Sequence, residues 1–264
     1  MFLALVIAYG LLVLVAAVFQ RRLIYFPRLI PPDLAEPAAA VNGFVPWRNP
    51  AGQIIGWKLP SSAPPAAGVL ITHGNAGCAL ERIYLAGPIH EAASVDVYVL
   101  EYPGYGARAG SPDKKSLFAA GEEAWNLLPA GRPRYLVSES IGTGVACHLA
   151  GTHPGEVAGL ALFGPYHDLA SVAQRQMPFL PAYWLLLDRF CPADDLKSYH
   201  GPVKMVVAGA DEVISPDFGR KLFAAYNGPK DLQVVPGARH NEVAAQSPDW
   251  WRQVFSFWQQ NGPP

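Results

Sequence analysis

The chain has 264 residues, of which 51% are hydrophobic, with 20 Lys and Arg against 21 Asp and Glu and only three cysteines. This length permits a large domain with a substantial buried core, and the near-neutral charge without a long Lys/Arg run argues against nucleic-acid binding. The cysteines are too few and too widely spaced for a disulfide framework, and no HExxH motif or close His/Asp cluster indicates a metal, so no cofactor is expected.

Residues 1–20 are predicted to form a transmembrane anchor. The first 19 carry no charged side chain, and as a helix they span about 28 Å, close to the hydrocarbon thickness of about 30 Å. Cations and aromatic residues follow, which are typical of a membrane interface: Arg21, Arg22, Tyr25, Phe26 and Arg28. Since the cations follow the span, the positive-inside rule favours a single-pass protein whose main domain lies on the cytoplasmic side.

A cleaved signal peptide and a buried soluble helix are the alternatives for this segment. A signal peptide would begin with a basic region and end at a small-residue cleavage site, and neither is evident here. A buried helix of a soluble protein would normally have a polar face, which this run lacks. A retained anchor is therefore favoured, while the other two remain open.

The main domain, residues 21–264, alternates apolar strands with helices. Strands are expected at 67–72, 95–100, 135–137, 157–163, 203–208 and 232–235, with 53–60 as an edge strand, and helices at 80–93, 116–128 and 249–260. This order predicts an α/β fold with a mostly parallel twisted sheet flanked by helices, whose strands end at one ligand-binding edge. Residues 169–200 contain no strand and are apolar, which indicates a small cap insertion over that edge.

A nucleophile elbow is expected at Ser140. An apolar strand runs directly into small residues and then into a predicted helix, so a tight turn would hold the Ser140 hydroxyl at the top of the sheet. The usual pattern is Gly-x-Ser-x-Gly, and here Ser138 replaces the first glycine. Glu139 precedes the nucleophile, and a structural role is favoured for it.

A base and an acid for this serine follow at later strand ends. Asp211 comes just after strand 203–208, and His240 follows the last strand. The order Ser, Asp, His is that of α/β-hydrolases and differs from the two other common triad folds. Asp168 is a rival acid because it follows strand 157–163. Cys78 lies near the expected site, but no base is paired with it.

The oxyanion of an acyl-transfer intermediate needs preorganised N–H donors. One is expected from Ile141, the residue after the nucleophile. The second is expected from Asn75, in the turn after strand 67–72, where glycines allow a close approach of the backbone to a substrate. His73, beside this turn, is interpreted as structural.

Together these segments resemble the membrane-anchored subfamily of α/β-hydrolase-fold serine hydrolases, some of whose members are protein depalmitoylases. The matching segments cover nearly the whole chain in order: 20–27, 73–77, 102–106, 138–142, 209–213 and 240–241. The resemblance implies that Ser140, Asp211 and His240 form a catalytic triad. Ser138 departs from the family pattern.

The sequence therefore favours a serine hydrolase that cleaves an ester or thioester through an acyl-enzyme. The anchor and the apolar cap indicate a lipidic acyl substrate, either a small molecule or an acylated protein, and the membrane is the other expected partner. The sequence does not indicate an oligomeric state. The expected substrate-binding residues are Tyr105, Phe179, Leu180, Tyr183 and Trp184. An amidase or peptidase with the same triad, or a non-catalytic membrane-tethered scaffold, are the alternatives.

Overall fold

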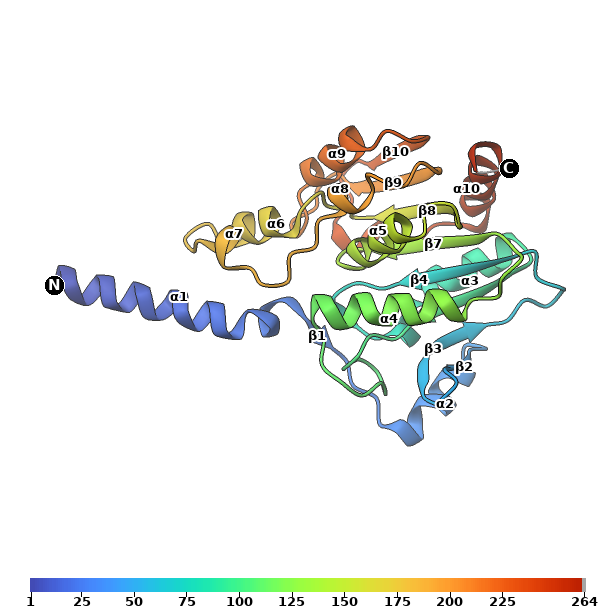
Figure 1. The fold of residues 1–264 in the computed structure, drawn as a ribbon, viewed down its shortest axis with the longest axis horizontal. Coiled ribbons are helices and arrows are strands. Elements are labelled where there is room, and N and C mark those ends of the chain that lie inside the picture. The colour runs from blue at the N-terminus through green and yellow to red at the C-terminus, as the bar shows by residue number, and fades with distance from the viewer. Residues whose placement is uncertain (263–264) are drawn as a thin grey trace.

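An eight-stranded sheet forms the centre of the computed structural model, which describes residues 1–262 (Figure 1). Its spatial order is β10-β9-β8-β7-β4-β6-β3-β2. The strands are β2 (Val45–Arg48), β3 (Ile54–Leu59), β4 (Ala67–Thr72), β6 (Val95–Leu100), β7 (Arg134–Glu139), β8 (Val157–Phe163), β9 (Val203–Ala208) and β10 (Lys230–Val235). The six strands from β10 to β6 are parallel, so the predicted α/β class is confirmed.

The antiparallel edge corrects one prediction. β3 pairs with both β2 and β6, so the strand expected at the edge lies one position inside it. The edge is formed by β2, which the sequence did not reveal. It is only four residues long and contains Pro46, whose missing N–H is tolerated at an edge.

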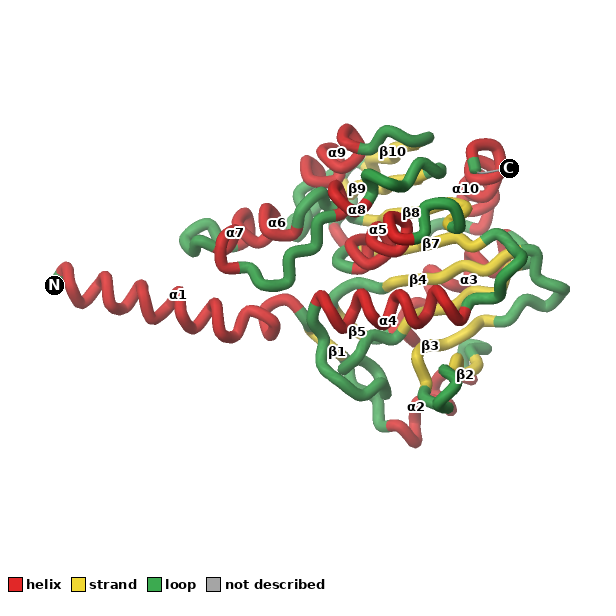
Figure 2. The backbone as a smooth tube through the Cα atoms, viewed as in Figure 1, coloured by secondary structure: helices red, strands yellow, loops and turns green. Residues whose placement is uncertain are grey.

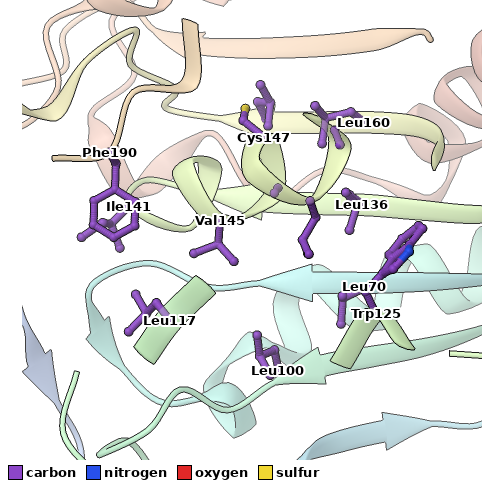
Figure 3. Close-up of a cluster of buried hydrophobic side chains, with 14 of the residues drawn as sticks. Leu70, Leu100, Leu117, Trp125, Leu136, Ile141, Val145, Cys147, Leu160 and Phe190 are labelled. Atoms are coloured by element: carbon purple, nitrogen blue, oxygen red, sulfur yellow. The ribbon is translucent and has the colours of Figure 1, made fainter. Parts of the chain in front are cut away.

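Helices cover both faces of the sheet, as parallel strands require. One face carries α3 (Ile83–Ala92) and α10 (Pro248–Asn261), and the other carries α4 (Lys114–Leu127), α5 (Gly142–Thr152) and α9 (Pro216–Ala225). Figure 3 shows Val145 and Cys147 of α5 close to strand residues such as Leu136. All three are fully buried, so the sheet firmly fixes the helix that follows the elbow.

Short elements complete the body around the site. They are β1 (Phe26–Pro27), α2 (Pro32–Ala40), β5 (Ala76–Gly77) and the 3-10 turns η1 (Ala79–Arg82) and η2 (His240–Glu242). β1 pairs in parallel with β5. This small pairing joins the segment after the N-terminal helix to the turn that contains Asn75.

The N-terminal helix, α1 (Phe2–Ile24), projects from the body beside the cap (Figure 1). It continues four residues beyond the predicted span, and Gln20 is its one buried residue, which rules out a buried core helix. The cap consists of α6 (Leu169–Gln176), α7 (Ala182–Leu185) and α8 (Pro192–Asp195), joined by loops (Figure 2). α1 is long and apolar enough to cross a membrane.

Candidate active site

Ser140 occupies a strained turn between β7 and α5. Its φ of 52° is the one positive value at a non-glycine position within residues 1–262, a conformation that costs free energy and is concentrated at functional sites. A Cβ on Gly142 would lie 2.3 Å from the Thr72 carbonyl oxygen, so only glycine fits there. At the other small-residue position, the buried Ser138 is accommodated, with its Oγ 3.5 Å from the Ala161 carbonyl oxygen.

A hydrogen-bonded chain connects Ser140 to His240 and Asp211. His240 Nε2 lies 3.0 Å from Ser140 Oγ, and His240 Nδ1 lies 2.7 Å from Asp211 Oδ2. Because the carboxylate can only accept, Nδ1 carries the proton and Nε2 is free to accept the serine proton. Asp211 Oδ1 accepts two backbone N–H groups, from Val213 and Ile214, at 2.8 and 2.7 Å. These bonds orient the carboxylate toward the imidazole.

The rival residues occupy other positions. Asp168 caps α6, accepting from the N–H groups of Ala170 and Ser171 at 3.0 Å. The buried Cys78 has no contact with His240, and burial raises the pKa of its thiol to about 11. It is therefore neutral near pH 7 and unsuited to be the nucleophile.

The N–H groups of Asn75 and Ile141 are available for an oxyanion. Within residues 1–262 neither donates a hydrogen bond to the protein, and both residues line the same cavity as Ser140. The Asn75 position is well fixed. Its carbonyl accepts from Tyr105 Oη at 2.7 Å, and its side-chain Nδ2 donates to the Ile24 carbonyl at 2.8 Å.

Glu139 connects the elbow to the loop that contains Asn75. Its carboxylate accepts from Gly74 N–H at 3.2 Å and from Tyr84 Oη at 2.5 Å. Arg82 Nε lies 2.7 Å away as an ion pair, without the alignment of a hydrogen bond. The structural role predicted for Glu139 agrees with these contacts, whereas its partners could not be found from the sequence because they lie more than 50 residues away.

His73 is buried beneath this loop. Its Nδ1 lies 2.7 Å from the Gly74 carbonyl oxygen, and its ring packs against Tyr102 with centroids 4.2 Å apart. It makes no hydrogen bond with Ser140, so its interactions suit the structural role that the sequence favoured.

A largely apolar cavity opens at Ser140. Its cavity volume is about 190 Å³, and the space that includes its open mouth is about 950 Å³. Its wall is built from three parts of the chain. One is the cap, a second is the sheet edge around Tyr166 and Ile214, and the third is the last two turns of α1. The contribution of α1 was not apparent from the sequence, because an anchor is recognised by composition alone.

Only one of the five expected substrate-binding residues, Leu180, lines this cavity. Tyr105 is buried and supports the Asn75 carbonyl. Phe179 and Trp184 are 86% and 77% exposed on the outside of the cap, and Tyr183 packs edge-on against Trp184. The inward-facing cap residues are instead aliphatic, among them Val172, Met177, Leu185 and Leu186. These four aromatic residues therefore do not line the cavity, because the direction of each side chain depends on packing between distant segments.

A second, more polar cleft is also lined by Ser140, together with His240. It is lined by charged and hydroxyl-bearing side chains, including Glu81, Arg82, Tyr84 and Glu139, together with Asn241. Ser140 therefore lines both the apolar cavity and this more polar cleft. Within residues 1–262, no three His, Cys, Asp or Glu side chains are placed to hold a metal ion.

Comparison with known proteins gives relatives along most of the chain, although no family model matches. An uncharacterised protein of Mycobacterium tuberculosis is 34% identical over 84% of this chain and 81% of its own length. The human alpha/beta hydrolase domain-containing protein 17B is 30% identical over 66% of this chain and 60% of its own length.

Solved structures of hydrolases share the fold at low sequence identity. An esterase from Pyrococcus furiosus matches with a TM-score of 0.66 and 14% identity over 91% of this chain and 99% of its own. A monoacylglycerol lipase from Paleococcus ferrophilus matches with a TM-score of 0.58 and 18% identity over 78% of this chain and 99% of its own. The chain thus has the alpha/beta hydrolase fold, and its sequence is similar to that of alpha/beta hydrolase domain-containing proteins.

Proposed function

We propose that this protein is a membrane-anchored serine hydrolase that cleaves a carboxylic ester or thioester through an acyl-enzyme. The observation that carries the proposal is the hydrogen-bonded chain from Asp211 through His240 to Ser140, at 2.7 and 3.0 Å. A serine hydroxyl is a weak nucleophile and needs such an oriented base. Ser140 also lines a largely apolar cavity.

The reaction follows from the positions of these groups. As Ser140 Oγ attacks the substrate carbonyl carbon, His240 Nε2 takes its proton, and Asp211 stabilises the resulting imidazolium. The N–H groups of Ile141 and Asn75 stabilise the oxyanion. His240 then returns the proton to the departing alcohol or thiol, which leaves Ser140 acylated. A water molecule, deprotonated by His240, attacks the acyl-enzyme, and collapse of the second intermediate releases the acid and restores the Ser140 hydroxyl.

The two compartments beside Ser140 suggest how the substrate is oriented. Aliphatic side chains such as Leu180 and Leu185 line one of them, and an acyl chain buried there would gain about 25 cal/mol per Å² of apolar surface removed from water. The more polar cleft has Arg82 and Tyr84 in its wall and would accommodate a polar leaving group. A lipidic acyl ester or thioester, carried by a small molecule or by an acylated protein, fits this division best.

The first test is covalent labelling of the full-length protein with a fluorophosphonate probe. We expect wild-type labelling at Ser140, and Ser140→Ala should abolish it while leaving the fold unchanged. His240→Ala should slow labelling by at least about 100-fold, in the range of general-base contributions. A folded wild-type protein that remains unlabelled would refute the hydrolase and favour a non-catalytic scaffold. Turnover of amides in preference to esters and thioesters would instead favour the amidase alternative.

A further inference from the structure

The last two turns of α1 form a wall of the cavity that contains the proposed nucleophile. Ala16, Ala17, Gln20, Leu23 and Ile24 all line it together with Ser140. From Ile24 back to Ala16 is eight residues, or about 12 Å of helix at 1.5 Å per residue. The cavity therefore follows the helix for roughly two turns away from the sheet edge. A simple tether would not contribute to the wall of the site.

Specific polar contacts fix α1 against the cap. The buried Gln20 donates to the Leu185 carbonyl at 3.2 Å and accepts from the Leu187 N–H at 2.7 Å. Arg21 Nε lies 3.1 Å from Asp188 Oδ2, on a carboxylate that is itself buried. The amide nitrogen and the amide oxygen of Gln20 both bind the backbone of the cap. These two bonds fix the position of α1 along its axis and its rotation about that axis. The face with Ala16 and Ala17 is thus held toward the cavity.

The cap carries exposed apolar side chains where it runs beside α1. Phe179, Trp184 and Leu187 are each more than two-thirds exposed, and Tyr9, near the middle of α1, donates to the Phe179 carbonyl at 2.9 Å. The cap thus extends along α1 toward its N-terminal half (Figure 1). If α1 spans a bilayer, these side chains enter the same apolar layer, as in proteins that dip partly into one leaflet.

We propose that α1 is part of the substrate site as well as a membrane anchor, and that the acyl chain reaches Ser140 directly from the bilayer, between α1 and the cap. This inference rests on the proposed hydrolase function. The occupant is a long-chain acyl group whose tail already lies in the leaflet that holds the second half of α1. The tail lies along α1, and the polar leaving group points to the aqueous side.

A matched pair of variants in the full-length protein, reconstituted in phosphatidylcholine vesicles, tests the inference. Ala17→Trp places a large side chain on the cavity face of α1, whereas Val18→Trp places the same one on the adjacent face, where Val18 is 65% exposed. The measurement is the ratio of kcat/KM for p-nitrophenyl palmitate to that for p-nitrophenyl butyrate. We expect Ala17→Trp to lower this ratio at least about tenfold and Val18→Trp to leave it within about twofold. Equal ratios in both variants would overturn the inference.

A photoreactive probe gives a second measurement that does not depend on a variant. A fluorophosphonate with a long alkyl chain and a terminal diazirine would attach at Ser140 and crosslink on irradiation to whatever lies at the chain end. We expect crosslinks within residues 9–24 of α1 and in the facing cap loop. Efficient labelling of Ser140 with crosslinks only elsewhere in the domain would refute the role of α1 alone. No labelling of Ser140 would refute the hydrolase itself, so the two failures are distinguishable.

Discussion

Ser138 occupies the position that normally holds glycine, two residues before the proposed nucleophile. It is fully buried in β7, between Thr72 of β4 and Leu162 of β8. Its Oγ lies 3.5 Å from the Ala161 carbonyl oxygen, at the outer limit for a hydrogen bond. The small side chain therefore fits the turn without displacing Ser140, whose bond to His240 is 3.0 Å long.

Ser138→Gly should consequently leave catalysis intact. We expect the rate of fluorophosphonate labelling and the turnover of a short-chain ester to stay within about twofold of wild type. Stability should fall by about 0.5–1 kcal/mol because glycine in a strand interior loses more backbone entropy on folding, a decrease that thermal unfolding would detect as a few degrees at most. A drop of tenfold or more in activity would show that the Ser138 hydroxyl has a role in the reaction.

At the scale of elements, the end of α1 is joined to the loop that contains Asn75, the proposed oxyanion donor. Asn75 Nδ2 donates to the Ile24 carbonyl at 2.8 Å, and β1 pairs with β5 directly after Asn75. The Ile24 carbonyl is one of the last four of the helix, which have no acceptor role within it. This one bond therefore gives the Ile24 carbonyl a hydrogen-bond donor and also fixes the position of Asn75. A displacement of α1 should consequently shift the Asn75 N–H, the proposed oxyanion donor.

Asn75→Asp tests this connection, because the change keeps the side-chain shape and the backbone N–H but removes the donor to Ile24. A carboxylate facing a carbonyl oxygen is repelled, so the loop should shift. We expect kcat to fall by about 10-fold or more with KM changed less than about threefold, since a misplaced oxyanion donor weakens binding of the transition state more than that of the substrate. Asn42→Asp, on an exposed turn, is the charge-matched control. A change in KM alone would contradict this role.

At the scale of the whole molecule, the parts of the site that follow from backbone topology could be predicted from the sequence. Parallel strands end at one edge, so Ser140, Asp211 and His240 could be expected to meet from their order alone, and they lie within hydrogen-bond distance. Tyr105 and Phe179 could not be placed in this way. Tyr105 faces inward beneath the Asn75 loop and Phe179 faces outward from the cap, and both directions are set by packing between distant segments.

The contribution of α1 to the cavity wall also depends on packing between distant segments, so the sequence could not predict it. Composition marks residues 1–20 as apolar all round, and such a helix gives no sign of which face meets protein. The structure adds two facts that only tertiary contact reveals. Gln20 is buried against the cap, and the helix continues to Ile24, where it reaches the site. Sequence thus predicts that an anchor exists, whereas its part in the cavity depends on three-dimensional packing.

The orientation of the whole molecule in the membrane is the last property to test. We propose that the hydrolase domain lies in the cytoplasm, because Arg21, Arg22 and Arg28 follow the span and basic residues are retained on that side. Phe2→Cys puts a thiol at the exposed N-terminal end of α1, and Asp249→Cys puts one on the exposed surface of the domain that follows α1. We expect a membrane-impermeant maleimide to label Phe2→Cys in intact cells and Asp249→Cys only after permeabilisation. Cys78 and Cys147 are buried, and the parent protein controls for the partly exposed Cys191. The reverse labelling pattern would place the domain outside the cytoplasm and would limit the proposed acyl substrates to those found there.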